Sequence, residues 1–204
     1  MRNNENGRSM VEMLGVLAII GVLSAGGLAG YSKAMFKHKL NSTMDQITML
    51  VTNIRTMYGT QGNYNGLSGT AAYQLGIIPA VMTTDSGANL TNPFKGSVAI
   101  TLTDATSGNA PASGADATGF TLTYSDLPAE ACIALSTSDF GSGAGSGFIG
   151  VDAKGQSGTQ KVSATKIGDT TYASAGYKEG SALTMSDAIT ACQGTTSSVK
   201  WYFY

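Results

Sequence analysis

The stretch MLGVLAIIGVLSAGGLAGYS, from Met13 to Ser32, contains no charged residue. As a helix that rises about 1.5 Å per residue, it is about 30 Å long, which matches the hydrocarbon core of a bilayer. Tyr31 and the basic residues that follow the stretch are typical of a membrane interface; these basic residues are Lys33, Lys37 and Lys39. The sequence therefore predicts one segment near the N-terminus that can span a membrane.

Two ordinary interpretations of this stretch are a transmembrane anchor and a secretory signal peptide cleaved near Ser24-Ala25-Gly26. Glu12 discriminates among the possible interpretations. It stands at the edge of the apolar stretch, where a signal peptide carries positive charge. A carboxylate near hydrocarbon costs about 3 kcal/mol on insertion scales, so such residues are usually functional and paired. Glu12 therefore favours a third interpretation, in which the segment is processed and then assembled.

The residues Gly7-Arg8-Ser9-Met10-Val11-Glu12 resemble the processing site of type IV prepilins. In that family a peptidase cuts after the glycine, the fifth residue of the mature chain is a glutamate, and the new α-amine is N-methylated. The resemblance implies that residues 1–7 are a leader peptide and that Arg8 becomes the N-terminus. It also implies that the Arg8 amine of one subunit pairs with Glu12 of a neighbour in a filament. Such pairing selects one register between helices, because an unpaired carboxylate inside an apolar bundle is costly.

Two features depart from the family pattern. Arg8 stands where prepilins usually have an apolar residue such as Phe or Met. The lysines after the apolar stretch also outnumber the basic residues before it, so the positive-inside rule alone predicts the opposite orientation. We expect the orientation that the resemblance implies, with the leader peptide in the cytoplasm, because the processing peptidase works there.

The helix is predicted to continue through residues 33–58 as an amphipathic half. Apolar residues recur there every three or four positions, namely Phe36, Leu40, Met44, Ile47, Val51, Ile54 and Tyr58. Gly59 and Gly62 are plausible stops for this helix. Five glycines lie in the preceding apolar half: Gly15, Gly21, Gly26, Gly27 and Gly30. Of these, Gly26-x-x-x-Gly30 forms a small-residue face that lets helices approach closely.

The following residues resemble the type IVb pilins, in which a short helix leads to a G-I-x-P step and then to an N-x-(W/F)-G-G turn. Here these motifs are Gly76-Ile77-Ile78-Pro79 and Asn92-Pro93-Phe94-Lys95-Gly96, with Lys95 where a glycine is common. Strands are predicted at residues 98–103, 120–124, 147–151 and 199–204. Short helices are predicted at 128–135, with Pro128 in the first turn, and at 186–192, with Ser186 as the N-cap.

Two cysteines, Cys132 and Cys192, lie in these two short helices. An even pair in an exported chain predicts one disulfide, although two separate buried thiols are the alternative. A disulfide of this span stabilises a fold by about 4 kcal/mol in the chain-entropy model. It would hold the C-terminal region against the sheet.

The chain shows no constellation for catalysis, metal binding or cofactor binding, so we expect no enzyme, metal or cofactor. His38 is the single histidine, and the glycine run from Gly141 to Gly147 lacks the Lys-Ser/Thr of a phosphate loop. The formal net charge is -1, with no basic excess for nucleic acid. Only 12% of residues are charged, which suits an exported protein that packs against copies of itself.

The expected fold is α+β, the pilin fold: a long N-terminal helix packed on a globular head with an antiparallel β-sheet and a disulfide-closed C-terminal region. We expect a leader peptide at 1–7, a membrane and filament-core half at 8–32, an amphipathic half at 33–58 and the head at 59–204.

The resemblance implies a subunit of an extracellular type IV pilus that starts as a precursor in the inner membrane of a Gram-negative-type bacterium. Its partners would be the membrane, the prepilin peptidase, an inner-membrane assembly platform and copies of itself. Such fibres support adhesion, aggregation, conjugative contact or motility. The alternatives are a type II secretion pseudopilin and an anchored or secreted protein without a filament role.

Overall fold

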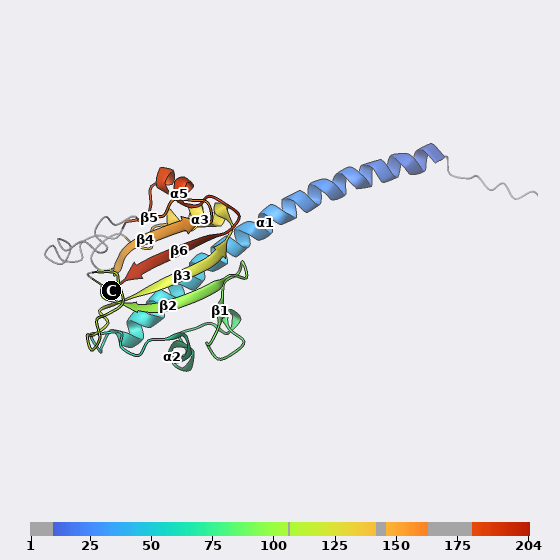
Figure 1. The fold of residues 1–204 in the computed structure, drawn as a ribbon. Coiled ribbons are helices and arrows are strands. Elements are labelled where there is room, and N and C mark those ends of the chain that lie inside the picture. Colours follow the sequence, from blue (N-terminus) through green and yellow to red (C-terminus); the bar gives the residue numbers. More distant parts are fainter. Residues whose placement is uncertain (1–9, 106, 142–145, 163–180) are drawn as a thin grey trace, which may run out of the picture. The chain divides into compact units, whose positions relative to one another are not determined.

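In the computed structural model the described residues are 10–105, 107–141, 146–162 and 181–204. The chain divides into two units, Met1–Lys39 and Leu40–Tyr204. Helix α1 (Met10–Tyr58) begins in the first unit and ends in the second (Figure 1). In the first unit the helix has no buried residue, and every residue from Met10 to Ala34 is exposed.

The part of α1 in the second unit buries one stripe of side chains against the rest of the head: Thr43, Ile47, Leu50, Ile54 and Tyr58. The predicted stripe was right for Ile47, Ile54 and Tyr58 and wrong for Met44 and Val51, which are only half-buried. The reason is that apolar residues occupy two neighbouring faces of this helix, so a search for spacings of three and four merges them. Only the face that contains Leu50 packs into the core.

Six strands form one sheet in which every pair of neighbours is antiparallel. They are β1 (Leu90–Thr91), β2 (Ser97–Thr103), β3 (Gly119–Leu127), β4 (Phe148–Gly155), β5 (Lys161–Val162) and β6 (Ser197–Phe203). The spatial order is β1-β2-β3-β6-β4-β5, so the last strand lies in the middle of the sheet. The four predicted strands are confirmed as β2, β3, β4 and β6, with ends shifted by up to four residues.

Strand β6 carries the aromatic part of the core. Trp201 lies opposite Leu122 of β3 and Val151 of β4, and it is fully buried. Its ring meets that of Tyr124 edge-on at a centroid distance of 5.6 Å, a favourable aromatic geometry. The expectation that the terminal aromatic run forms a paired strand is therefore confirmed.

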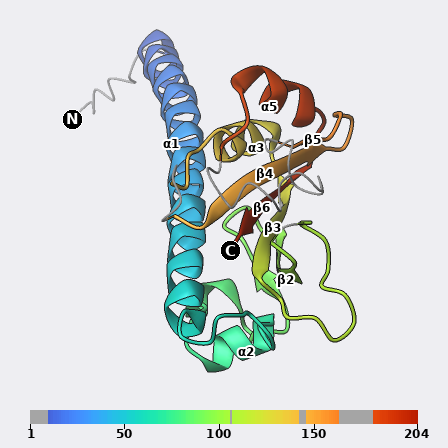
Figure 2. The ribbon, with the colours of Figure 1, turned by 90° about the vertical axis from the view of Figure 1, so that its left-hand side faces the viewer.

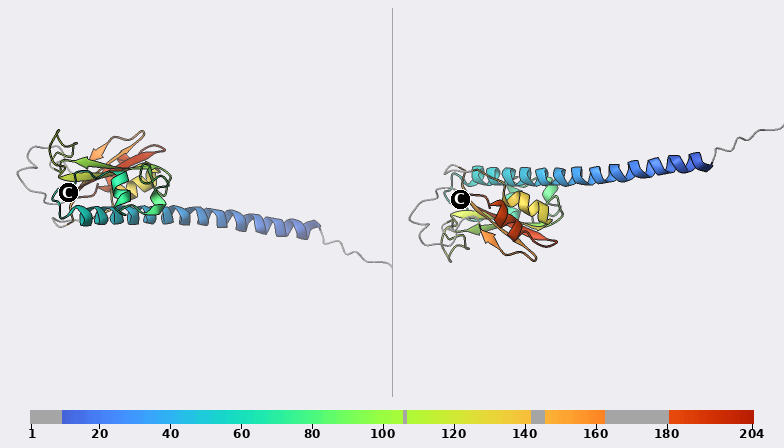
Figure 3. Two further views of the ribbon diagram at one scale, coloured as in Figure 1. Left: turned by 90° about the horizontal axis from the view of Figure 1, so that it is seen from below. Right: turned by 90° about the horizontal axis from the view of Figure 1, so that it is seen from above.

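Among the described residues of the head, the other helical segments are α2 (Gly69–Gln74), η1 (Ala80–Met82), α3 (Ala129–Ser136) and α5 (Met185–Ala191). The later, cyan half of α1 lies along one face of the sheet, and α3 and α5 lie together beside β4 (Figures 2 and 3).

The predicted cap of α5 was wrong. Thr184, not Ser186, is the N-cap, because its Oγ1 accepts the N–H of Asp187 at 3.2 Å. Pro128 is likewise the N-cap of α3 rather than part of its first turn.

Candidate functional site

Glu12 lies in the first turn of α1 and is exposed. A carboxylate at this position interacts favourably with the N-terminal end of the helix dipole. Its neighbours Val11 and Met13 are 74% and 48% exposed, so the acid is set in apolar surface. Gly7 and Arg8 lie outside the described residues, so cleavage and pairing with Glu12 stay predictions.

The first part of α1 is an uncovered apolar surface. The large apolar side chains between Met10 and Tyr31 are about half to four-fifths exposed. Among the described residues, α1 is the one helix long and apolar enough to cross a membrane, judged by length and composition. A Cβ built on Gly15, Gly21, Gly26, Gly27 or Gly30 would meet nothing within 4 Å. Contacts within this chain therefore do not require these glycines, and they leave room for a second helix to approach closely.

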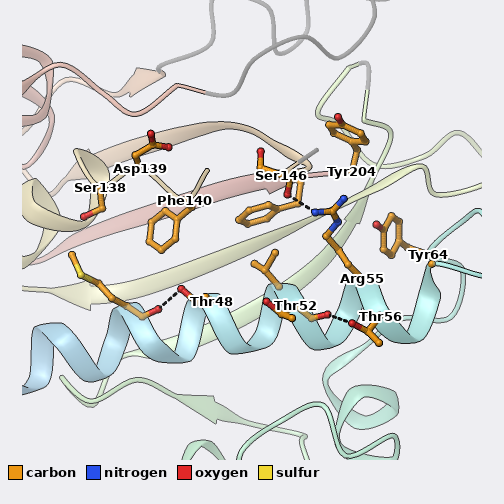
Figure 4. Close-up of a pocket in the computed structure, with 14 residues that line it drawn as sticks. Thr48, Thr52, Arg55, Thr56, Tyr64, Ser138, Asp139, Phe140, Ser146 and Tyr204 are labelled. Atoms are coloured by element: carbon orange, nitrogen blue, oxygen red, sulfur yellow. Dashed lines mark hydrogen bonds between the residues drawn. The ribbon is translucent and has the colours of Figure 1, made fainter. Parts of the chain in front are cut away.

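A groove runs along the head half of α1, with a volume of about 720 Å³ (Figure 4). We call it the α1 groove. Its floor is one face of α1, formed by Met44, Thr48, Val51, Thr52, Arg55 and Thr56. Its opposite wall includes Ser138, Asp139 and Phe140, which follow α3, and Ser146, which precedes β4.

Two of the three threonines of the α1 groove have hydroxyl groups that are hydrogen-bonded within the helix. The hydroxyl of Thr48 donates to the carbonyl oxygen of Met44 at 3.0 Å, and that of Thr56 donates to the carbonyl oxygen of Thr52 at 2.7 Å. Because these hydroxyls are bonded back to the helix, this face can be covered without leaving their donors unpaired. Residue-by-residue analysis of the sequence missed the groove, although threonines at every fourth position were a visible signal.

Arg55 closes one end of the α1 groove. Its guanidinium donates a hydrogen bond to the carbonyl oxygen of Ser146 and lies near Tyr64 (Figure 4). Burial raises the pKa of the Tyr64 hydroxyl, and the charge and hydrogen bond of Arg55 offset part of that rise. Gly147 has a φ of +71°, and a Cβ there would lie 2.7 Å from Cζ of Arg55. Arg55 therefore fills space that only a glycine at 147 leaves open.

The disulfide joins Cys132 of α3 to Cys192, the C-cap residue of α5, with the Cα atoms 5.8 Å apart. Both cysteines are buried. Since α3 packs on β4 and β6, the bridge fixes the C-terminal helix to the sheet, as the sequence predicted.

Within the described ranges, no group of three or more His, Cys, Asp or Glu side chains is placed to hold a metal ion. His38 is exposed on α1. What these surfaces offer is apolar area and charge for contact with other molecules.

Comparison with known proteins identifies the family to which the chain belongs. The family model Bundlin matches residues 33–201. Two major structural subunits of bundle-forming pilus, from Escherichia coli O127:H6 and O111:H-, are 28% and 27% identical over 200 residues, which is 98% of this chain and 94% of each relative. The crystal structure of a type IV b pilin from Salmonella typhi superimposes with a TM-score of 0.50 at 16% identity, covering 79% of this chain and 97% of that one. The chain therefore belongs to the Bundlin family and has the type IV b pilin fold.

Proposed function

We propose that this chain is the precursor of a structural subunit of an extracellular type IV pilus of the type IVb class. The observation that carries the proposal is the first part of α1, whose apolar side chains are uncovered from Met10 to Tyr31. Such a surface is stable in a lipid bilayer or in a bundle of like helices, and a pilus subunit occupies both in turn. Membership of the Bundlin family supports the second destination, since two relatives are major structural subunits of a pilus.

The proposed division of the chain follows from this life cycle. Residues 1–7 are removed by a prepilin peptidase, and residues 8–32 hold the subunit in the inner membrane and later form the filament core. Residues 33–58 join that core to the head, which comprises residues 59–204. An inner-membrane assembly platform adds each subunit to the growing fibre.

Glu12 has the role of selecting the register. In the membrane its carboxylate lies at the interface, and in the filament it pairs with the methylated α-amine of Arg8 in an adjacent subunit. A buried ion pair adds little net stability, but the loss of one partner leaves a costly charge. The pairing therefore fixes the axial position of each subunit in the bundle. This activity is structural, and no step of it requires catalysis by the chain.

The filament is tested by shearing bacteria that express this chain with its assembly system and imaging the released material. We expect long fibres composed mainly of this subunit. Short periplasmic assemblies would instead indicate a pseudopilin, and a chain found only in the membrane would indicate an anchored protein without a filament role.

A further inference from the structure

Charge is divided unevenly along the chain. Residues 1–39 contain five basic and two acidic side chains, a formal charge of +3, whereas residues 40–204 contain seven basic and eleven acidic side chains, a formal charge of -4. Three of the five basic residues fall within 33–39. A membrane interface accommodates these lysines, but the positive-inside rule does not account for their excess over the basic residues before the apolar stretch.

The lysines of this segment are available for contact. Lys33 and Lys37 are exposed, and one helical turn separates them, so they lie on the same face of α1. Neither has an ion-pair partner among the residues that the structure describes. Phe36, which is half-buried, lies three residues after Lys33 and adds apolar surface beside this face.

The complementary charge lies at the end of the α1 groove near Asp139, whereas Arg55, the one cation among the described lining residues, lies at the other end and donates to Ser146 (Figure 4). Asp139 is exposed at the rim of the groove, and its Oδ1 accepts the N–H of Gly141 at 2.9 Å. Asp45 is exposed on α1 about one turn before Thr48 and Met49, so helix periodicity places it beside the groove floor. Within the described ranges no cation pairs with either carboxylate. Two acids thus flank a groove whose floor is made largely of methyl groups.

We propose that the α1 groove binds the basic segment 33–39 of a second copy of this chain. Lys33 and Lys37 of that copy pair with Asp45 and Asp139, and its Phe36 covers the floor formed by Val51 and the threonines. This inference rests on the proposed function, because it names the contact that joins one subunit to the next in the fibre.

The geometry of the contact suits a fibre. Segment and groove are different surfaces of the same chain, so each copy offers one of each, and such head-to-tail contacts extend into an open helical assembly when the rotation between copies does not close a ring. Covering the floor costs little, because the hydroxyls of Thr48 and Thr56 are already bonded within the helix. All four side chains are exposed, so these lysine–aspartate pairs contribute mainly to specificity and register.

Zero-length cross-linking of wild-type fibres tests the contact directly. A carbodiimide joins a carboxylate to an amine only where the two are in contact, and dimer bands from a denaturing gel contain the links between copies. We expect peptides that join Lys33 or Lys37 to Asp45 or Asp139. Dimer bands linked only through other residues would overturn the inference while the fibre itself stands. Failure of the wild-type chain to form fibres would instead refute the proposed function.

Charge reversal tests whether the contact matters for assembly. We expect Asp139→Lys and Lys37→Glu each to lower the yield of sheared fibres about tenfold, the change that about 1.4 kcal/mol per contact produces. The double variant should recover most of the yield. The matched control is Glu130→Lys, an exposed acid on α3 that does not line the groove, which should leave the yield unchanged. An unchanged yield from both single variants, or equal losses from Asp139→Lys and Glu130→Lys without recovery in the double variant, would contradict the inference.

Discussion

The side-chain amide of Asn92 donates a hydrogen bond from Nδ2 to the carbonyl oxygen of Ser125 at 2.9 Å, which ties the turn between β1 and β2 to the end of β3. The Oδ1 atom of Asn92 accepts the N–H groups of Phe94 and Gly96 at 2.9 and 3.0 Å. Gly96 lies so close to β3 that a Cβ built on it would be 1.9 Å from the carbonyl oxygen of Ser125. These hydrogen bonds and this close approach therefore leave the backbone of the turn one available path.

This path places Lys95 at a φ of +71°, in the left-handed region. A residue with a Cβ is destabilised by about 1–2 kcal/mol in this region. Glycine avoids that strain, but its larger conformational entropy in the unfolded state offsets part of the advantage. We expect Lys95→Gly to raise the free energy of unfolding by about 0.5–1 kcal/mol in urea titrations of the full chain in detergent. Lys95→Ala keeps the strained backbone and removes only the charge, so it should leave stability nearly unchanged. Equal effects of the two substitutions would mean that the backbone is not strained.

The disulfide should make a large contribution to the stability of the head. It closes a span of 60 residues, for which the chain-entropy model gives about 4 kcal/mol. Replacing both cysteines by alanine should lower the unfolding temperature of the chain well below that of the wild type. A reducing agent should lower the wild-type value and leave the double variant unaffected. A wild-type unfolding temperature that is insensitive to full reduction would contradict this prediction.

Asp152 should destabilise the head at neutral pH. Burial raises the pKa of its carboxyl above the ordinary 3.8, although the hydrogen bond from Gln160 and the charges of Lys200 and Lys154 oppose the rise. The folded state therefore holds the proton more tightly than the unfolded state, and stability due to this group falls as the pH rises from 3.8 through the raised pKa. Above that window Asp152→Asn should unfold at a higher temperature than the wild type, and below it the two should converge.

The control for Asp152 is the exposed acid Asp126, whose change to Asn should leave the unfolding temperature at neutral pH as it is in the wild type. The same pH dependence in Asp152→Asn as in the wild type would show that this carboxyl is not the source. Thermal unfolding followed at several pH values between about 3 and 7 covers the relevant window.

Glu12→Val should leave processing intact and reduce the fibre yield about tenfold or more, because the new α-amine of a neighbour then lacks its partner inside the bundle. Immunoblots of the cell fraction and of sheared fibres separate these two steps. Glu5→Val removes an acid from the leader peptide, which is cut away in the proposed pathway, so it should assemble normally. Wild-type fibre yield from Glu12→Val would remove the proposed role of this residue.

The local elements were predictable because their signals lie within short windows. The apolar stretch from Met13 to Ser32 and the spacing of Ile47, Ile54 and Tyr58 predicted α1, and the run Trp201–Tyr204 predicted β6. Thr184 and Ser186 both suit an N-cap. Asp187 decides between them, since the Thr184 hydroxyl also donates to its Oδ2 at 2.8 Å.

The remaining features depend on contacts between distant residues. The place of β6 between β3 and β4 is a property of the whole sheet, and the two-residue strands β1 and β5 exist only through their partners. Thr43 is buried because of what packs on it, not because of its own polarity. The α1 groove likewise arises where α1 meets residues 138–140 and Ser146, which lie about ninety positions further along the chain.

Mass spectrometry of the subunit isolated from sheared fibres tests the central claim most directly, since it reads the N-terminus that α1 presents to its neighbours. The account predicts a chain that starts at Arg8, carries an N-methylated α-amine and retains Glu12 as its fifth residue. An intact Met1, or a chain that starts near Ala25, would contradict it.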